Sequence, residues 1–292
     1  MEDFLMKPKI DFAFKEIMME EKARVGFLSA VLKLKPEDIK ETTILNSYLR
    51  KVHDKDKLGI LDVRVLLNND TEIDTEIQLS ALAAWADRSL FYISKMYVDQ
   101  LGEGEDYTKF KKCVSISILD FTLFKEDENF YSCFHILEDT RHTKYTDKME
   151  FHVIELPKLP VELQDSSDDL LLWAKFINAE KEEEFDMVAA KNTYIRSAYE
   201  HLQVISQDEE KRLEYEARKK AIRDYNQGIR EAKEEGKEEG REEGIEIGKE
   251  QGKREFVKNL FAMGQSLEFI AQATGLSLEK IEKLKKELEG VV

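Results

Sequence analysis

Two short runs of alternating apolar and polar residues, 59–67 and 72–79, lie close together in the first third of the chain. Residues 68–70, Asn-Asn-Asp, separate them and are typical of a tight turn. The pattern predicts a β-hairpin, because successive side chains of a strand point to opposite faces. One face is apolar. The polar face carries Asp62 and Arg64 on the first strand, and Asp74, Glu76 and Gln78 on the second.

Apolar residues at helical spacing flank the hairpin and predict helices over 10–34 and 81–101. Three later segments are rich in β-branched and aromatic residues and are predicted to be strands: 113–124, 130–137 and 149–156. No strand pattern follows the last of them. This order of elements predicts a mixed β-sheet with helices packed on it.

Beyond the predicted sheet the pattern is helical, and between 228 and 252 glycine recurs every four residues, with Ala232 in the one gap. Six glycines inside a helix would cost roughly 1 kcal/mol each relative to alanine, so an isolated helix should not tolerate them. The spacing suggests that another backbone approaches along the stripe. We therefore favour a helix that pairs with its own copy or with another helix, over a flexible charged linker.

The last segment contains two short apolar-faced helices around a turn at Thr274-Gly275, and Ser277 is placed to cap the second helix. Its lysines are offset by glutamates, so a helical cap or docking unit is a better interpretation than a DNA reader. These boundaries divide the chain into a core (1–165), a helical region (166–225), a glycine-repeat oligomerisation helix (226–258) and a helix-turn-helix unit (259–292).

Charge and composition narrow the possible functions. The 292 residues carry a net charge of −16, which argues against coating nucleic acid through bulk electrostatics but not against a local metal-dependent site. Two cysteines provide neither a disulfide framework nor a tetrahedral cysteine zinc set, and the five histidines show no metal-ligand spacing. No leader and no apolar run of ~18 residues is evident, which predicts a cytoplasmic protein without a membrane span.

The polar face of the hairpin carries the candidate chemistry. Asp62 and Glu76 could share one Mg²⁺ ion if the register brings them together, and the backbone carbonyl of Ile77 could add a ligand. Such an ion makes water nucleophilic for phosphodiester hydrolysis. Gln78 could orient that water but has no positive charge. On spacing alone, a solvated sheet face explains Asp…Glu-x-Gln more readily than an active site does.

Five segments in a fixed order are informative together: Lys9–Lys15, Leu61–Arg64, Thr75–Gln78, Arg88–Tyr92 and Val114–Phe121. With the glycine repeat and the terminal helices, they resemble the Rpn family of recombination-promoting nucleases and transposases, within the PD-(D/E)XK superfamily. The resemblance implies an α/β, restriction-endonuclease-like mixed sheet flanked by helices, with an all-helical C-terminal extension. It also implies DNA endonuclease activity dependent on Mg²⁺ or Mn²⁺ and a link to recombination or mobile elements.

By position, the resemblance implies that Asp62 and Glu76 are metal ligands and that Gln78 stands where the family has lysine. Asp11 and Lys15, one helical turn apart, could flank the site or contact phosphate, or could form an ordinary surface pair. Arg88 could contact phosphate or have a structural partner. The alternative function is a weak or inactive nuclease fold that acts as an assembly or regulatory module through its C-terminal helices.

Overall fold

The computed structural model describes residues 4–49, 61–81, 84–163 and 168–288. The chain forms two compact units, Met1–Ile222 and Arg223–Val292. The helices that follow residue 165 therefore pack in the same unit as the sheet up to residue 222. No described helix has the length and apolar character that crossing a membrane requires.

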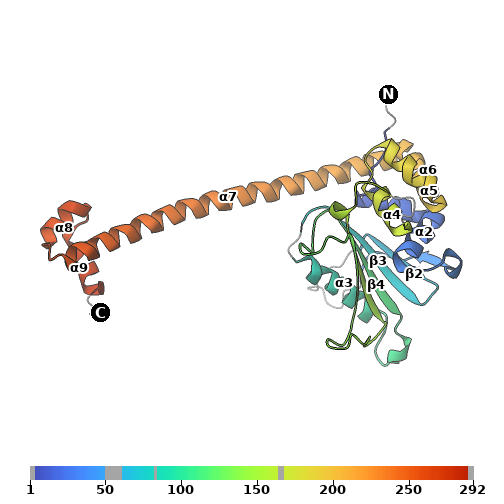
Figure 1. Ribbon diagram of the computed structural model, residues 1–292, viewed down its shortest axis with the longest axis horizontal. Coiled ribbons are helices and arrows are strands. Elements are labelled where there is room, and N and C mark those ends of the chain that lie inside the picture. Colours follow the sequence, from blue (N-terminus) through green and yellow to red (C-terminus); the bar gives the residue numbers. More distant parts are fainter. Residues whose placement is uncertain (1–3, 50–60, 82–83, 164–167, 289–292) are drawn as a thin grey trace. The chain divides into compact units, whose positions relative to one another are not determined.

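A six-stranded mixed sheet forms the centre of the first unit (Figure 1). The strands lie in the order β1-β2-β3-β4-β6-β5, with β3, β4 and β6 parallel and the other pairings antiparallel. The predicted mixed sheet is confirmed, although β4 and β5 are shorter than their apolar runs. The strands are β1 (Thr42–Ile44), β2 (Val63–Leu67), β3 (Thr71–Gln78), β4 (Lys112–Leu119), β5 (Tyr131–His135) and β6 (Met149–Glu155).

Strands β2 and β3 form the predicted hairpin, and Val63 pairs with Thr75. Asn68 and Asn69 turn the chain with φ of 48° and 57°, a left-handed conformation that asparagine adopts more readily than most residues. Every second side chain of β2, together with Ile73 and Ile77 of β3, enters the main core, so the polar side chains between them lie on the other face. Residues 59 and 60, where the predicted first strand begins, lie outside the described residues.

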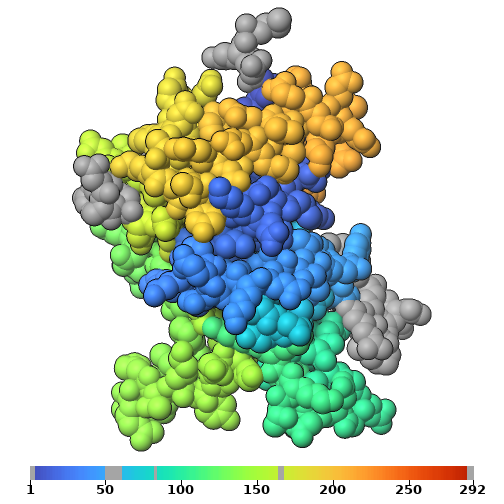
Figure 2. Space-filling view, turned by 90° about the vertical axis from the view of Figure 1, so that its right-hand side faces the viewer, coloured from blue at the N-terminus to red at the C-terminus, as the bar shows by residue number. Residues whose placement is uncertain are grey.

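One face of the sheet is covered by a layer of helices from both ends of the unit. Figure 2 shows the yellow and orange helices lying directly against the blue N-terminal helices. The single helix predicted over 10–34 is wrong, because Glu20 is extended and its side chain caps the second helix by accepting from the Ala23 N–H. The layer contains α1 (Asp11–Met19), α2 (Glu21–Leu32), α4 (Asp169–Asn178), α5 (Glu182–Lys191) and α6 (Thr193–Gln207).

The opposite face of the sheet is covered by α3 (Trp85–Val98), which is shorter than the predicted helix over 81–101. Its residues Trp85, Ile93 and Met96 are buried against apolar side chains from the sheet. Its Arg88 reaches Glu76 on the polar face of the hairpin. The described residues of the unit also form three short 3₁₀ helices: η1 (Pro36–Asp38), η2 (Tyr107–Lys109) and η3 (Leu156–Lys158).

The glycine repeat is helical throughout, as part of the 54-residue α7 (Glu209–Ala262). A Cβ atom added at any repeat glycine would meet nothing within 4 Å among the described residues, so the stripe is open. After α7, helices α8 (Leu267–Thr274) and α9 (Leu278–Leu288) pack a small core with its end. Gly275 ends α8 with φ of 69°, and the Ser277 hydroxyl accepts from the Lys280 N–H, as predicted.

Candidate active site

The strand register brings Asp62 and Glu76 together at one end of the hairpin. The Asp62 N–H donates to Glu76 Oε1 at 3.1 Å, and the Ile77 N–H donates to Asp62 Oδ2 at 3.0 Å. Each carboxylate thus accepts a hydrogen bond from the backbone of the opposite strand. These two reciprocal hydrogen bonds hold the Asp62 and Glu76 side chains next to each other. The alternation pattern alone does not predict this proximity.

The polar face of β3 is buried beneath α3. Asp74 is 1% exposed and Glu76 is 4% exposed, so the expectation of a solvated sheet face is wrong for these residues. Neither carboxylate oxygen of Asp74 has a hydrogen-bond partner in the described part of the chain. Burying carboxylates in this way is costly unless a proton or a cation compensates them.

Burial raises the pKa of each carboxyl group in this cluster. Desolvation, followed by the Asp62 charge, raises the pKa of Glu76 to about 8, against the opposing effect of Arg88. Desolvation also raises the pKa of Asp62 to about 6, and the Ile77 hydrogen bond opposes it. The pKa of Asp74 is raised well above its usual range by desolvation and then by Glu76. Perturbed groups of this kind gather at functional sites.

Arg88 on α3 brings positive charge to the carboxylates. Its Nη2 lies 3.4 Å from Glu76 Oε2. The guanidinium also lies over the Tyr92 ring, 5.0 Å from its centroid, and over the Trp85 ring at 5.7 Å. These cation–π contacts help to hold it in place. Of the two expectations for Arg88, the structure shows the partner, and the phosphate contact stays a prediction.

Ile77 and Gln78 lie at the same end of β3. In an antiparallel pairing, the N–H and C=O of one residue point to the same neighbouring strand. The Ile77 N–H bonds to Asp62, so the Ile77 carbonyl also points toward the Asp62 edge. Gln78 shares the Glu76 face, and its Nε2 donates to the Ser80 carbonyl at 3.1 Å. Because the amide nitrogen of Gln78 is used in this bond, its side-chain oxygen is the atom that can bind a water molecule.

An open pocket lies beside Asp62, between α1 and the start of α7. Arg218 Nε donates to Asp11 Oδ2 at 2.6 Å, so the surface pair expected between Asp11 and Lys15 is not seen. Lys15 forms no ion pair with a described residue. The sequence does not single out Arg218, because it lies in a helix rich in charged residues and no motif surrounds it. The pocket is lined by Asp11, Phe12, Lys15, Leu61, Asp62, Glu214, Ala217 and Arg218.

Comparison with known families agrees with this arrangement. A family model described as PD-(D/E)XK nuclease family transposase matches residues 8–232, which include the whole sheet and the carboxylate cluster. The chain belongs to this family. The mixed sheet flanked by helices fits the restriction-endonuclease-like fold of PD-(D/E)XK proteins, so the predicted fold class is confirmed. Searches of curated proteins and of solved structures found no match.

Membership of the PD-(D/E)XK transposase family supports a nuclease-type enzyme that acts on DNA, and nucleases of this superfamily generally use divalent metals. The donor set of this chain suits such an ion. Asp62 and Glu76 offer carboxylate oxygens, and the Ile77 carbonyl points to the same edge. Hard divalent cations prefer these oxygen ligands. The unpartnered oxygens of Asp74 add acceptor capacity on the same face.

Proposed function

We propose that this protein is a DNA endonuclease of the recombination-promoting type, dependent on Mg²⁺ or Mn²⁺. The observation that carries the proposal is the hydrogen-bond exchange between Asp62 and Glu76 on a buried, acidic face. Burying the charged carboxylates of this face costs free energy, and a bound divalent cation would compensate their charge. Asp62, Glu76 and the Ile77 carbonyl are the proposed ligands.

A divalent ion supplies a nucleophilic water and charge stabilisation for phosphodiester hydrolysis. The protein's own residues supply the rest. Gln78 orients the attacking water through its side-chain oxygen, which can only accept a hydrogen bond. Arg88, which contacts Glu76 from α3, supplies the positive charge that Gln78 lacks. Lys15 and Arg218, at the pocket beside Asp62, contact the phosphate backbone of the DNA.

Cleavage of a supercoiled plasmid tests this function directly. The full-length protein is expected to convert the plasmid to nicked and linear forms with Mg²⁺ or Mn²⁺, and EDTA is expected to stop the reaction. Activity should also fall as salt rises, because phosphate contacts release counterions. Cleavage that persists in EDTA, or no cleavage with either metal, would reject the metal-dependent nuclease.

Arg88→Ala is expected to lower the rate of plasmid cleavage about 10²–10³-fold, the usual effect of removing one group that stabilises transition-state charge. The reason is that Arg88 is the cation placed against Glu76 by α3. Rates measured at saturating Mg²⁺ separate this effect from weaker metal binding.

Moving the positive charge from position 88 to position 78 tests the proposed role of Arg88. Adding Gln78→Lys to Arg88→Ala should restore part of the lost rate, because it returns a cation to the same face from β3. Lys95→Ala, on the same helix but paired with Asp99, serves as the matched control and should cleave like the unaltered protein. A double variant no faster than Arg88→Ala would show that Arg88 has a structural role instead.

We further propose that the protein self-associates through the 226–258 part of α7. The repeat glycines leave an open stripe along an exposed helix, and no described side chain covers it. Close approach of a second backbone would offset the helix-propensity cost of these glycines. In the alternative function, this assembly is the main activity and cleavage is weak or absent.

Changing Gly240, Gly244 and Gly248 to Gln is expected to abolish self-association, because the new side chains would hold a second helix away. Light scattering at matched concentrations measures the mass. Gln is a better helix former than Gly, so circular dichroism should show equal or greater helix content. The control places Gln at Glu242, Glu246 and Glu250, about 200° around the helix. An unchanged mass in the glycine variant would indicate a spacer helix.

A further inference from the structure

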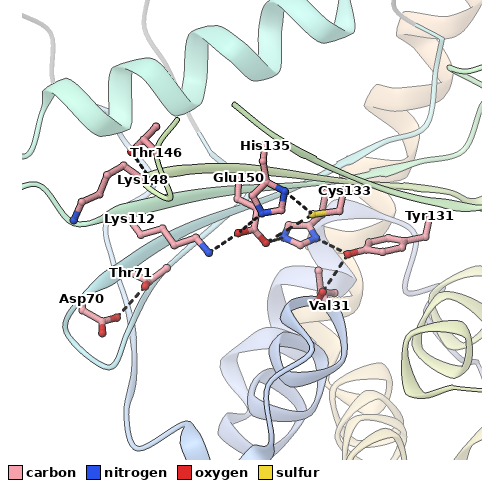
Figure 3. Close-up of polar contacts among 11 residues, drawn as sticks. Val31, Asp70, Thr71, Lys112, Tyr131, Cys133, His135, Thr146, Lys148 and Glu150 are labelled. Atoms are coloured by element: carbon pink, nitrogen blue, oxygen red, sulfur yellow. Dashed lines mark hydrogen bonds and ion pairs between the residues drawn. The ribbon is translucent and has the colours of Figure 1, made fainter. Parts of the chain in front are cut away.

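A second cluster of ionisable side chains lies where β5 pairs with β6 (Figure 3). The register places Cys133 opposite His152 and His135 opposite Glu150, so all four side chains share one face of the sheet. It is the face covered by α2, whose Val31 carbonyl accepts a hydrogen bond from the Tyr131 hydroxyl at 3.4 Å. Asp62 and Glu76 lie on the other face, under α3, so the two clusters are separate.

Donor atoms of Cys133, Glu150 and His152 converge, because one ligand atom from each lies within 4.8 Å of the others. Glu150 Oε1 lies 2.9 Å from His152 Nε2 and 3.8 Å from Cys133 Sγ. His135 Nδ1 lies 3.9 Å from the same sulfur. Zn–N and Zn–S bond lengths in a tetrahedral site put neighbouring ligand atoms about 3.3–3.6 Å apart. Small rotations of Cys133, Glu150 and His152 would therefore bring them to zinc-binding distances, and a rotation of His135, whose Nε2 lies 3.3 Å from Glu150 Oε2, would add the fourth ligand.

The hydrogen bonds around His152 leave one of its nitrogens available to a metal. The Tyr131 hydroxyl donates to the Val31 carbonyl and lies 2.8 Å from His152 Nδ1, so we assign the Nδ1 proton to a bond with the tyrosine oxygen. Nε2 then carries a lone pair and faces Glu150. Although these atoms are 2.9 Å apart, Nε2 has no hydrogen bond of proper geometry in the described structure.

This arrangement is the one that ligating histidines use, with the second ring nitrogen held by an outer partner. His152 is only 2% exposed, so its orientation is fixed by packing. Glu150 is also oriented for metal binding. Lys112 and His135 contact its Oε2, and its Oε1 faces Cys133 and His152. An ion pair between His152 and Glu150 would account for the short distance, but it would not account for the convergence of the thiol.

We propose that Cys133, His135, Glu150 and His152 form a Zn²⁺ site that joins the edge strand β5 to the rest of the sheet. One sulfur, two imidazole nitrogens and one carboxylate oxygen suit zinc and not Mg²⁺, which prefers oxygen ligands. Four protein ligands close the coordination sphere, as in structural zinc sites. The proposal does not depend on the nuclease function.

Zinc content of the full-length protein tests the site. Metal-free protein incubated with Zn²⁺ in excess Mg²⁺ and then desalted is expected to retain about one zinc ion per chain. Cys133→Ser and His152→Gln should each lose it. Tyr131→Phe should weaken zinc affinity about 10–100-fold, the usual effect of removing an outer partner of a ligand. With Co²⁺, the intact protein should show thiolate-to-cobalt absorption and tetrahedral d–d bands.

Two controls distinguish this site from zinc bound at the hairpin carboxylates or at the second cysteine. A variant with both Asp62→Asn and Glu76→Gln should keep its zinc, because those carboxylates lie on the opposite face. Cys113→Ser changes the other cysteine, which is buried beneath α3, and should also keep it. Cys133 is exposed, so its substitution decides the question even if His152→Gln fails to fold. Equal zinc content in Cys133→Ser, or a cobalt spectrum without a thiolate band, would overturn the proposal.

Discussion

Asp62→Asn and Glu76→Gln are each expected to reduce Mg²⁺-dependent plasmid cleavage by on the order of 10³-fold or more. A catalytic metal supplies several kcal/mol of transition-state stabilisation, and each 1.36 kcal/mol corresponds to a tenfold change in rate. Each substitution removes a proposed ligand but keeps the size of the side chain. Initial rates of nicking, measured over a range of Mg²⁺ concentrations, give the effect.

The same variants should be at least as stable as the unaltered protein when no metal is present. Burial disfavours both charges, as the raised pKa values of Asp62 and Glu76 indicate, so neutral amides remove a cost of folding. Thermal melts in EDTA at about pH 8 measure this. Asp70→Asn, at the exposed far end of the same hairpin, is the matched control and should cleave normally. Equal nicking by all three variants would place the active site elsewhere.

The hairpin is the part of the fold that the sequence predicts best, because its contacts are local. Alternation identifies the polar face, and Asn68 and Asn69 supply the turn that sets the register. The pairing of Asp62 with Glu76 follows from that register. By contrast, the separation of α1 from α2 depends on the backbone of Glu20, and no periodicity marks it.

Other parts of the site arise from contacts between distant segments. The burial of Asp74 and Glu76 depends on residues that are distant in the sequence, such as Arg88 of α3, and alternation alone favours a solvated face. Arg218 reaches Asp11 from a helix whose charged residues show no local pattern. The convergence of Cys133 with His152 depends on the pairing of β5 with β6, so the spacing of the histidines could not reveal it.

The unfolding free energy of the metal-free protein is expected to fall as the pH rises from about 5 to above 8. In the folded protein the pKa of Glu76 is about 8, against an ordinary value of 4.5, and that of Asp62 is about 6, against 3.8. Between these values the unfolded chain has released protons that the folded protein still holds, so rising pH favours unfolding. Above pH 5 the titrations of Asp62 and Glu76 together span about 4 pKa units, and one pKa unit is worth about 1.4 kcal/mol, so the loss is on the order of 5 kcal/mol.

Denaturant unfolding at a series of pH values in EDTA measures this loss. Other groups also titrate in the range, so the informative quantity is the difference between the unaltered protein and Glu76→Gln. The variant lacks the buried titrating group and should show a shallower decline. Identical slopes for the two proteins would mean that Glu76 is not held protonated by burial.

Mg²⁺ should reverse this pH dependence, because it binds the ionised carboxylates and competes with protons for them. The increase in melting temperature on adding Mg²⁺ is therefore expected to be larger at about pH 8.5 than at about pH 6, and DNA cleavage should accelerate over the same interval. Glu76→Gln should lose both effects. A Mg²⁺-induced shift that is equal at both pH values, or that survives in Glu76→Gln, would show that the ion binds away from the hairpin. If the pH-dependent shift is present and cleavage is absent, the metal site is intact, and Arg88 then does not replace the lysine charge that Gln78 lacks.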